Sequence, residues 1–201
     1  MPGRRTGCRG VPCGVPALTL CGVHPVPLSD DVVLRLLRPG DGELLLSAYE
    51  RNREHLAPWE PERTDIFWTA GWHEQQVAGA LAGHAAGRSV PLVLVQEERV
   101  VGRLNVDDVV RGAFRSAHLG YWVDAAMTGR GLMTAAVEAA AAHCRDTLAL
   151  HRLQAATLVH NAASQAVLAR TGFERIGTAP RYLKIAGRWQ DHVLFQRILH
   201  D

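Results

Sequence analysis

The sequence predicts a mixed α/β domain in which helices cover a central β-sheet. Two patterns predict this fold class. Helical and strand periodicities alternate in the second half of the chain, and short apolar runs joined by tight turns dominate its middle and its end. The length of 201 residues suits one domain with a substantial core. A hydrophobic content of 47% and a charged content of 21% are typical of a soluble globular protein.

The first half of the chain predicts one strand and two helices separated by a loop. Residues 32–38 form a short apolar strand, and Asp41 can cap the helix that runs from there toward Asn52. Residues 56–61 predict a stiff aromatic loop, because two prolines fix the backbone there. Apolar residues then recur at steps of three and four between residues 70 and 86, which predicts a second helix.

The second half predicts hairpins and strand–helix units. Residues 91–96 and 99–106 form two apolar runs around an acidic turn, which is the pattern of a β-hairpin. A helix at residues 131–147 contains six alanines, which are small enough to let it lie close to a sheet. The remaining patterns predict strands at 116–123, 152–159, 173–185 and 191–199, and a helix at 161–170.

Residues 1–30 differ from the rest in composition. They are rich in Gly and Pro and hold three of the four cysteines, Cys8, Cys13 and Cys21. Pro12 and Pro16 break the apolar run that a signal peptide needs, and the cysteine spacing matches no zinc site. We therefore expect a poorly ordered extension or an over-long start. The fourth cysteine, Cys144, falls on the alanine-rich helix and is expected to be a buried thiol.

The bulk properties disfavour several classes of function. A net charge of +2 is too small to argue for nucleic-acid binding, and no apolar run approaches the length of a membrane span. The ten histidines show no spacing typical of metal ligands, so we expect no metal. Because nothing in the cysteine usage demands an oxidising compartment, we expect a cytoplasmic protein.

A Gly-x-Gly turn between a strand and a helix is the most informative local motif. Gly129 and Gly131 flank Arg130 at this turn, directly before the alanine-rich helix. Glycines let the backbone turn sharply, and the helix start offers backbone N–H groups together with the positive end of its dipole. Such a turn suits a pyrophosphate, although the same turn also fits a strand-to-helix connection that binds nothing.

A second segment decides between these alternatives. Asn161-Ala162-Ala163-Ser164 opens the next helix. A motif at residues 151–155 precedes it, and motifs at residues 168–174 and 187–192 follow it. Together with the glycine turn, they resemble the GCN5-related N-acetyltransferases (GNAT), and within them the ribosomal-protein-alanine N-acetyltransferases. The resemblance runs from about residue 32 to the C-terminus. It implies a GNAT domain over residues 31–201, with six to seven mostly antiparallel strands and about four flanking helices.

The resemblance implies acetyl-coenzyme A as cosubstrate, with its pyrophosphate on the backbone of residues 128–134. It also implies that the strand ending at Val123 lies beside the pantetheine arm, and that a backbone N–H near Val123 stabilises the oxyanion. The implied cofactor contacts are Tyr121, Trp122, Val123, Thr128, Gly129, Arg130, Gly131, Leu132, Met133, Thr134, Asn161 and Ser164.

Some of these positions have alternatives or depart from the family pattern. Arg130 also fits a solvated turn residue, and core packing is the favoured role for Trp122. Thr128 stands where the family usually has Gln or Arg, which is expected to weaken one phosphate contact. Met133 stands where Gly or Ala is usual, but the ribosomal-protein subgroup tolerates it.

The same resemblance supplies candidates for proton transfer. Asn161 is expected to cap its helix and to contact the cofactor or the reacting region. Many relatives place a tyrosine seven residues later to protonate the leaving thiolate, but here that position is Leu168. In the subgroup that acetylates ribosomal proteins, the serine of the Asn-x-x-Ser motif has this task, so the resemblance implies that Ser164, one turn along the same helix, is the candidate acid.

The general base is less well marked. A protein α-amino group has a pKa near about 7.7–8.0 and needs only mild help to become neutral. Asp107, Asp108 and His118 are candidates on or beside neighbouring strands, although each also fits an ordinary polar surface residue. The glutamate that some relatives use has no clear counterpart, since Leu183 occupies the position at which it would be sought.

The acceptor groove is expected between the aromatic loop and a turn near Tyr182. Trp59 and Glu60 would place an aromatic wall beside a carboxylate, which suits a cationic amine, although Trp59 also fits a loop anchor. Three functions remain open: acetylation of a protein N-terminus, acetylation of a small-molecule amine, and coenzyme A binding without catalysis. A homodimer is plausible by resemblance alone.

Overall fold

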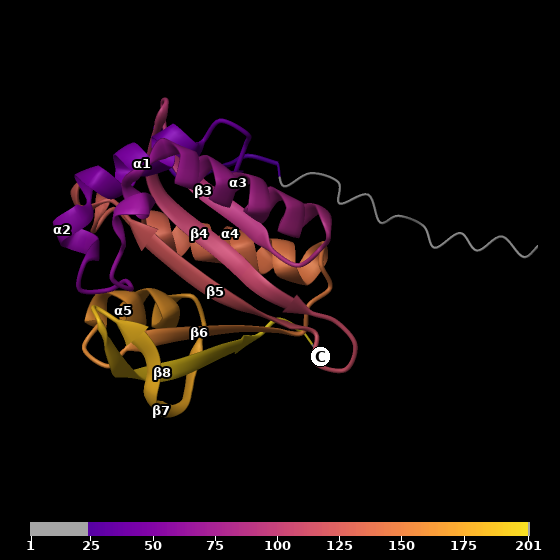
Figure 1. Cartoon of the computed structure of the whole chain (residues 1–201). Helices are drawn as coiled ribbons and strands as arrows, with labels where there is room; N and C mark the ends of the chain where they lie inside the picture. Colours follow the sequence, from indigo (N-terminus) through magenta and orange to yellow (C-terminus); the bar gives the residue numbers. More distant parts are fainter. Residues whose placement is uncertain (1–23, 201) are drawn as a thin grey trace, which may run out of the picture.

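The computed structural model describes residues 24–200 of the chain, as one curved sheet with helices on both faces (Figure 1). The sheet has the strand order β1-β2-β3-β4-β5-β6-β8-β7. Its strands are β1 (Val26–Pro27), β2 (Val33–Leu36), β3 (Val90–Gln96), β4 (Arg99–Val110), β5 (Ser116–Val123), β6 (Arg152–Leu158), β7 (Glu174–Ile185) and β8 (Arg188–Ile198). All neighbours pair antiparallel except β5 and β6, which pair parallel.

Four of the five helices among residues 24–200 follow the predicted positions within one residue at each end, whereas the short helix at residues 53–56 was not predicted. The helices are α1 (Gly42–Arg51), α2 (Arg53–Leu56), α3 (Ala70–Ala85), α4 (Leu132–Asp146) and α5 (Ala162–Arg170), with short 3-10 turns η1 (Asp65–Trp68) and η2 (Ala125–Met127). The predicted α/β class with a mostly antiparallel sheet is confirmed. Within residues 24–200 the sheet has one strand more than the six to seven expected, because the two-residue β1 pairs with β2.

The N-terminal segment enters the fold earlier than its composition indicated. Val26 and Pro27 pair with Leu34 and Val33 at the edge of the sheet. Cys8, Cys13 and Cys21 lie outside the described residues, and so does the prediction that they form no zinc site. Cys144 is fully buried on α4, as predicted.

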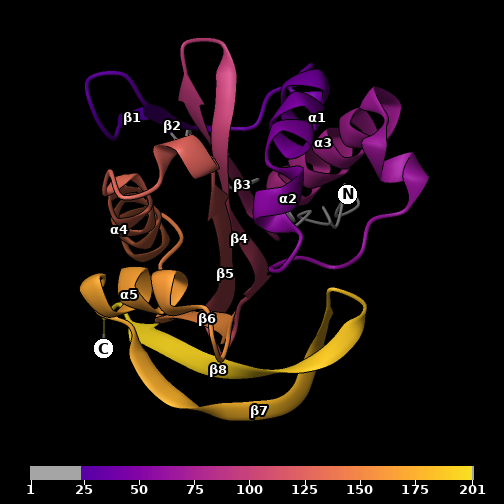
Figure 2. The same ribbon diagram turned by 90° about the vertical axis from the view of Figure 1, so that its left-hand side faces the viewer.

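The two faces of the sheet carry different helices. Figure 2 shows α1, α2 and α3 on one side of β3–β5, and α4 with α5 on the other. Side chains alternate along β5, so Leu119 and Tyr121 pack in the core beneath α4, whereas Trp122 packs with the α1–α3 layer. Ala136 and Ala140 are buried on α4, which lets this helix lie close to the strands.

The parallel strands β5 and β6 separate partway along their length. Their register runs from Ser116 opposite Arg152 to Leu119 opposite Ala155 and goes no further. Beyond that point, β5 stays paired with β4 up to Val123, and β6 stays paired with β8. The result is a wedge-shaped gap on one side of the last residues of β5.

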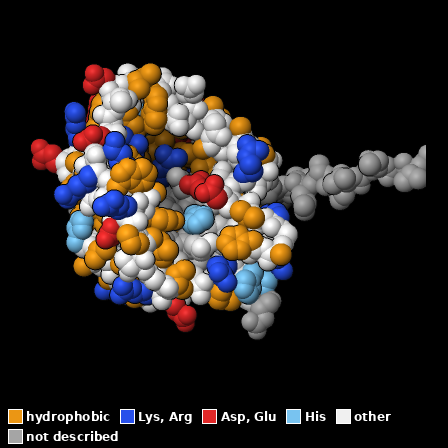
Figure 3. Space-filling view, turned by 60° about the horizontal axis from the view of Figure 1, so that its bottom comes forward, with side chains coloured by type: hydrophobic (Ala, Val, Ile, Leu, Met, Phe, Trp, Pro, Cys, Tyr) orange, Lys and Arg blue, Asp and Glu red, His pale blue; other side chains and the backbone are white. Residues whose placement is uncertain are grey.

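The surface mixes both signs of charge. Figure 3 shows Lys and Arg side chains toward both edges of one face, with acidic side chains and a histidine near its hollowed middle. No helix among residues 24–200 has the length and apolar character needed to cross a membrane.

A buried polar network ties the end of β5 to the first helices. Asp124, which is 3% exposed, accepts hydrogen bonds from Arg51 Nε at 2.9 Å, Asn52 Nδ2 at 3.1 Å and the Ala126 N–H at 3.0 Å. Asn52 Oδ1 in turn accepts from the Ala125 N–H at 2.9 Å. Burial opposes the charge of Asp124, but the hydrogen bonds from Asn52, Arg51 and Ala126 outweigh it and lower its pKa.

We expect the stability of the protein to depend on the ionised form of Asp124. Because its pKa is lower in the folded state, its contribution is present above the unfolded pKa of about 3.9 and is lost as the pH falls through the folded value. Asp124→Asn should therefore lower the free energy of unfolding by about 1–3 kcal/mol at pH 7 and by less in acid. Urea unfolding between pH 7 and pH 3 measures both effects.

The control variant for this experiment is Glu98→Gln, which removes an exposed carboxylate from the turn between β3 and β4. Its unfolding curves should follow those of the wild type across the range. A loss for Asp124→Asn that stays constant down to pH 3 would contradict the proposed role of the carboxylate charge.

Candidate functional site

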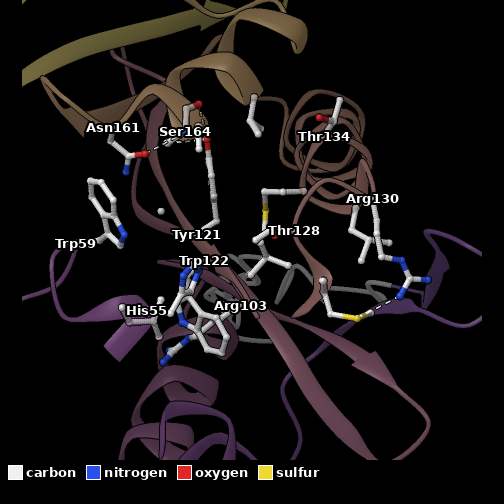
Figure 4. Close-up of a pocket in the computed structure, with 18 of the residues that line it drawn as sticks. His55, Trp59, Arg103, Tyr121, Trp122, Thr128, Arg130, Thr134, Asn161 and Ser164 are labelled. Carbon is white, nitrogen blue, oxygen red and sulfur yellow. Dashed lines mark hydrogen bonds between the residues drawn. The ribbon is translucent and has the colours of Figure 1, made fainter. Parts of the chain in front are cut away.

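A cavity of about 1210 Å³ runs along the gap beside β5 (Figure 4). One end is formed by the glycine turn and the first residues of α4, and α5 contributes one wall. The other end reaches the α2 region, where His55, Trp59 and Glu60 lie opposite Arg103 and Asn105 of β4. The cavity therefore connects the predicted anion site to the predicted acceptor side.

The glycine turn has the backbone conformation that its sequence predicts. Gly129 and Gly131 have φ angles of 75° and 74°, in the left-handed region that favours glycine. Gly131 is the N-cap of α4 and makes no side-chain capping bond. The N–H groups of Leu132, Met133 and Thr134 belong to the first helical turn, where no carbonyl of the helix can accept them. Since these residues line the cavity, the turn presents the donors that a phosphate needs.

Two polar side chains of this turn are already engaged. Arg130 Nη2 lies 2.9 Å from the carboxylate of Asp31, and Arg130 Nη1 contacts Met127 Sδ at 3.2 Å. Hydrogen bonds from Ser29 and Arg130 lower the pKa of Asp31 to about 2. Thr128 donates its hydroxyl proton to Ala125 O at 2.9 Å. The predicted anion site consequently consists mainly of backbone N–H groups.

The end of β5 presents two backbone amides to the gap. The N–H of Asp124 donates to Val101 O on β4 at 2.8 Å. Because successive amides of a strand point to opposite sides, the N–H groups of Val123 and Tyr121 point away from β4, toward the side on which β6 has diverged. These are donors of the kind that can hold an extended ligand or an oxyanion.

Tyr121 and Ser164 meet across this gap. The Tyr121 hydroxyl lies 2.9 Å from Ser164 Oγ and also donates to Ser164 O at 3.2 Å. Burial raises the pKa of Tyr121 to about 12, so the phenol stays protonated at neutral pH. Asn161 caps α5 as predicted, since its Oδ1 accepts from the Ser164 N–H at 3.1 Å. Leu168 is fully buried in the core.

The acceptor end contains residues that the sequence analysis named and residues that it missed. Trp59 packs against His160 with ring centroids 5.5 Å apart, and Glu60 pairs with Arg63 at 2.7 Å. Trp122 donates its indole N–H to the Tyr49 hydroxyl at 3.0 Å. The residues missed are Tyr49, His55, Arg103 and Asn105. The alternation of polar residues with apolar ones along β4 was a signal that could have revealed the last two.

Four of the residues considered from the sequence do not line this cavity, namely Asp107, Asp108, His118 and Tyr182. Asp107 lines a neighbouring cavity, and His118 lies opposite it on β5, with its Nδ1 3.8 Å from the carboxylate of Asp108. Tyr182 is 39% exposed on β7 and packs against His192. The antiparallel register places Asp107 five residues along the sheet from Val123, which its position in the sequence did not reveal, and His118 precedes Val123 by five residues on β5 itself.

No cysteine lines this cavity in the described part of the chain. Cys144 lies outside it, and burial raises the pKa of its thiol to about 12. No group of three or more His, Cys, Asp or Glu side chains among residues 24–200 is arranged to hold a metal ion.

Comparison with known proteins places this geometry in a family. A family model described as an acetyltransferase (GNAT) domain matches residues 31–174. The chain belongs to the GNAT family. It is accordingly an N-acetyltransferase, like the curated relatives whose sequences it matches.

The relatives of this GNAT enzyme include proteins that modify ribosomal proteins. The [ribosomal protein uS5]-alanine N-acetyltransferase of Escherichia coli is 37% identical over 169 residues, which span 83% of this chain and 87% of that protein. The crystal structure of the ribosomal-protein-S5-alanine acetyltransferase from Vibrio fischeri is 32% identical with a TM-score of 0.85, covering 89% of this chain and 98% of that one. RimJ from Mycobacterium smegmatis, in complex with CoA-disulfide, is 35% identical with a TM-score of 0.79, covering 83% and 81%.

We expect Gly131→Ala to weaken both the fold and the anion site. A Cβ at this position would meet nothing within 4 Å, so the penalty comes from the positive φ alone. That penalty is about 1–2 kcal/mol for an L-residue, and relaxation away from it would turn the first N–H groups of α4. Thermal unfolding should show the loss of stability, and calorimetry should show weaker binding of coenzyme A.

Gly71→Ala is the matched control for this variant. Gly71 also has open space around its Cβ position, but it sits at the start of α3 without a positive φ. Alanine there should leave stability and coenzyme A binding at least as high as in the wild type. Equal behaviour of the two variants would show that the left-handed backbone at Gly131 has no such role.

Proposed function

We propose that this enzyme transfers the acetyl group of acetyl-coenzyme A to the N-terminal amine of a protein, and that the protein is ribosomal. The observation that carries the proposal is the single cavity that joins the N-terminus of α4 to the polar end beside α2, across the gap between β5 and β6. Identity of 37% to an enzyme named for the alanine of ribosomal protein uS5 supports the choice of acceptor.

The residues present fit acetyl-coenzyme A. Its pyrophosphate would be held by the N–H groups of residues 131–134, and its pantetheine by the backbone amides of β5 that face the gap. Arg130 would contact a phosphate only by exchanging its pairing with Asp31. A structure of a 35% identical relative in complex with CoA-disulfide supports this assignment.

The transfer would be direct, with no acetyl group on the enzyme. The neutral amine attacks the thioester carbonyl, a C–N bond forms, and the C–S bond breaks. The nitrogen loses its surplus proton to solvent, which in turn reprotonates Ser164. The N–H of Val123 is the donor for the developing oxyanion, and Ser164 supplies a proton to the leaving thiolate. Tyr121 holds the Ser164 hydroxyl at 2.9 Å. Cys144 is buried outside the cavity, so it takes no part.

The first test is release of free coenzyme A thiol from acetyl-coenzyme A, with peptides that begin with Ala or Ser as acceptors. We expect turnover with these peptides and none with the same peptides already acetylated at the N-terminus. Small free amines should be acetylated at least about 100-fold less efficiently in kcat/KM, because they leave the polar end of the cavity unfilled. Turnover confined to small amines would move the enzyme to another substrate class.

We expect Ser164→Ala to lower kcat by roughly 100-fold, a typical effect of removing a general acid. The affinity for coenzyme A should stay within about twofold, since the phosphate donors are backbone groups. The defect should shrink above about pH 9, where a thiol with a pKa near 8.5 leaves readily without a proton. Steady-state kinetics from pH 6 to pH 10 measure this, with Ser47→Ala on the exposed face of α1 as control.

Tyr121→Phe separates positioning from proton donation. Removing its hydroxyl leaves Ser164 Oγ without the partner at 2.9 Å, so kcat should fall, but less than in Ser164→Ala. The pH dependence should keep the wild-type shape, because Ser164 still carries the proton. A fall larger than that of Ser164→Ala would make the phenol itself the acid.

A further inference from the structure

A second cavity continues the acceptor end of the site. It has a volume of about 590 Å³ and lies between α3 and β4. The two cavities share the lining residues Tyr49, Arg63, Arg103 and Asn105. A chain that enters the first cavity at its acceptor end can therefore continue into the second.

The floor of the second cavity is a row of polar side chains on β4. Arg103, Asn105 and Asp107 alternate along the strand and so share one face, opposite Gln75 and Gln76 of α3. Arg103 Nε donates to Asn105 Oδ1 at 3.0 Å. Such a row of amide and guanidinium groups suits the carbonyl and N–H groups of an extended peptide.

The charges change sign along this row. Arg103 lies at the end shared with the first cavity, whereas the charge of Arg63 is balanced by Glu60 at 2.7 Å. Asp107 lies at the far end, and no cationic side chain among the described residues is within ion-pair distance of its carboxylate. Its cross-strand neighbour His118 lies nearer to Asp108, at 3.8 Å. Asp107 is exposed, but neighbouring protein atoms displace part of the water around its carboxylate and raise its pKa, which a bound cation would reverse.

The sheet register gives the distance from Asp107 to Val123, whose N–H is the proposed oxyanion donor. Gly102 of β4 lies opposite Val123, and Asp107 is five residues further along the strand. At about 3.3 Å per residue this separation is about 16 Å. An extended acceptor peptide advances by a similar rise, so the Cα of its sixth residue would draw level with Asp107. A long basic side chain at the fourth or fifth position can span the remaining one or two residues of rise and reach the Asp107 carboxylate.

We propose that the cavity between α3 and β4 binds the segment that follows the acetylated residue, and that Asp107 binds a basic side chain at the fourth or fifth position of the acceptor. This inference rests on the proposed function, because it requires a peptide acceptor. It makes Asp107 a specificity residue instead of the general base considered from the sequence. It also explains how the enzyme would distinguish a protein N-terminus from a small amine.

The test uses the full-length enzyme and three hexapeptides that begin with Ala and carry Lys, Ala or Glu at both positions four and five. An Ala-starting tripeptide, too short to reach Asp107, is the reference acceptor. For the wild type we expect KM to be about three- to tenfold lower for the Lys peptide than for the Ala peptide, with similar kcat. The Glu peptide should have the highest KM.

Two variants assign this preference to one carboxylate. Asp107→Asn should reduce the ratio of KM values for the Lys and Ala peptides to about one, and Asp107→Lys should favour the Glu peptide. Asp108→Asn removes the neighbouring carboxylate, which does not line the cavity, and should retain the wild-type preference. Binding of coenzyme A by calorimetry checks that each variant is folded.

The outcomes separate the two proposals. Turnover of all peptides with no charge preference, or a preference that survives Asp107→Asn, overturns the inference and leaves the proposed function intact. Equal losses for the tripeptide and the hexapeptides in Asp107→Asn would place Asp107 in the chemistry and also overturn it. Turnover of no peptide, with small amines accepted, overturns both.

Discussion

The separation of β5 from β6 after the pair Leu119 and Ala155 is the constraint on which the site depends. Each strand keeps an antiparallel partner on its other side, so the gap leaves only a few backbone groups of β5 without a neighbouring strand. Buried backbone groups need partners, and an extended ligand with amide groups can supply them. The gap is thus a binding feature of the sheet itself, and Asp124 holds its end through Arg51 and Asn52.

The period of two along a strand divides the site between the two faces of the sheet. Tyr121 points to the side of α4 and α5, where it meets Ser164, and Trp122 points to the side of α1, where it meets Tyr49. Two adjacent residues therefore face the proposed coenzyme A side and the proposed acceptor side of the site. The same alternation on β4 directs Arg103, Asn105 and Asp107 to the acceptor side, while Leu104 and Val106 fill the core.

Electrostatics divides the site in a similar way. At the proposed coenzyme A end, the donors are backbone N–H groups of a helix start, and the guanidinium of Arg130 in the glycine turn is paired with Asp31. At the acceptor end the charges belong to side chains, with Arg63 balanced by Glu60 and with Arg103 and Asp107 at the two ends of the β4 row. Backbone donors suit the pyrophosphate of a cosubstrate, which is the same in every reaction. Side-chain charges suit an acceptor that the enzyme must distinguish from other amines.

The sequence by itself determined the features whose signals are local. Glycine spacing predicted the left-handed turn at Gly129 and Gly131, Asn161 predicted a helix cap, and periodicity predicted nearly every element. Tertiary structure decided what depends on register and distant packing: the contact of Tyr121 with Ser164, the pairing of Arg130 with Asp31, and the displacement of Asp107 from Val123. The partners in these pairs lie far apart along the chain or on different strands, so no local pattern encodes their distance.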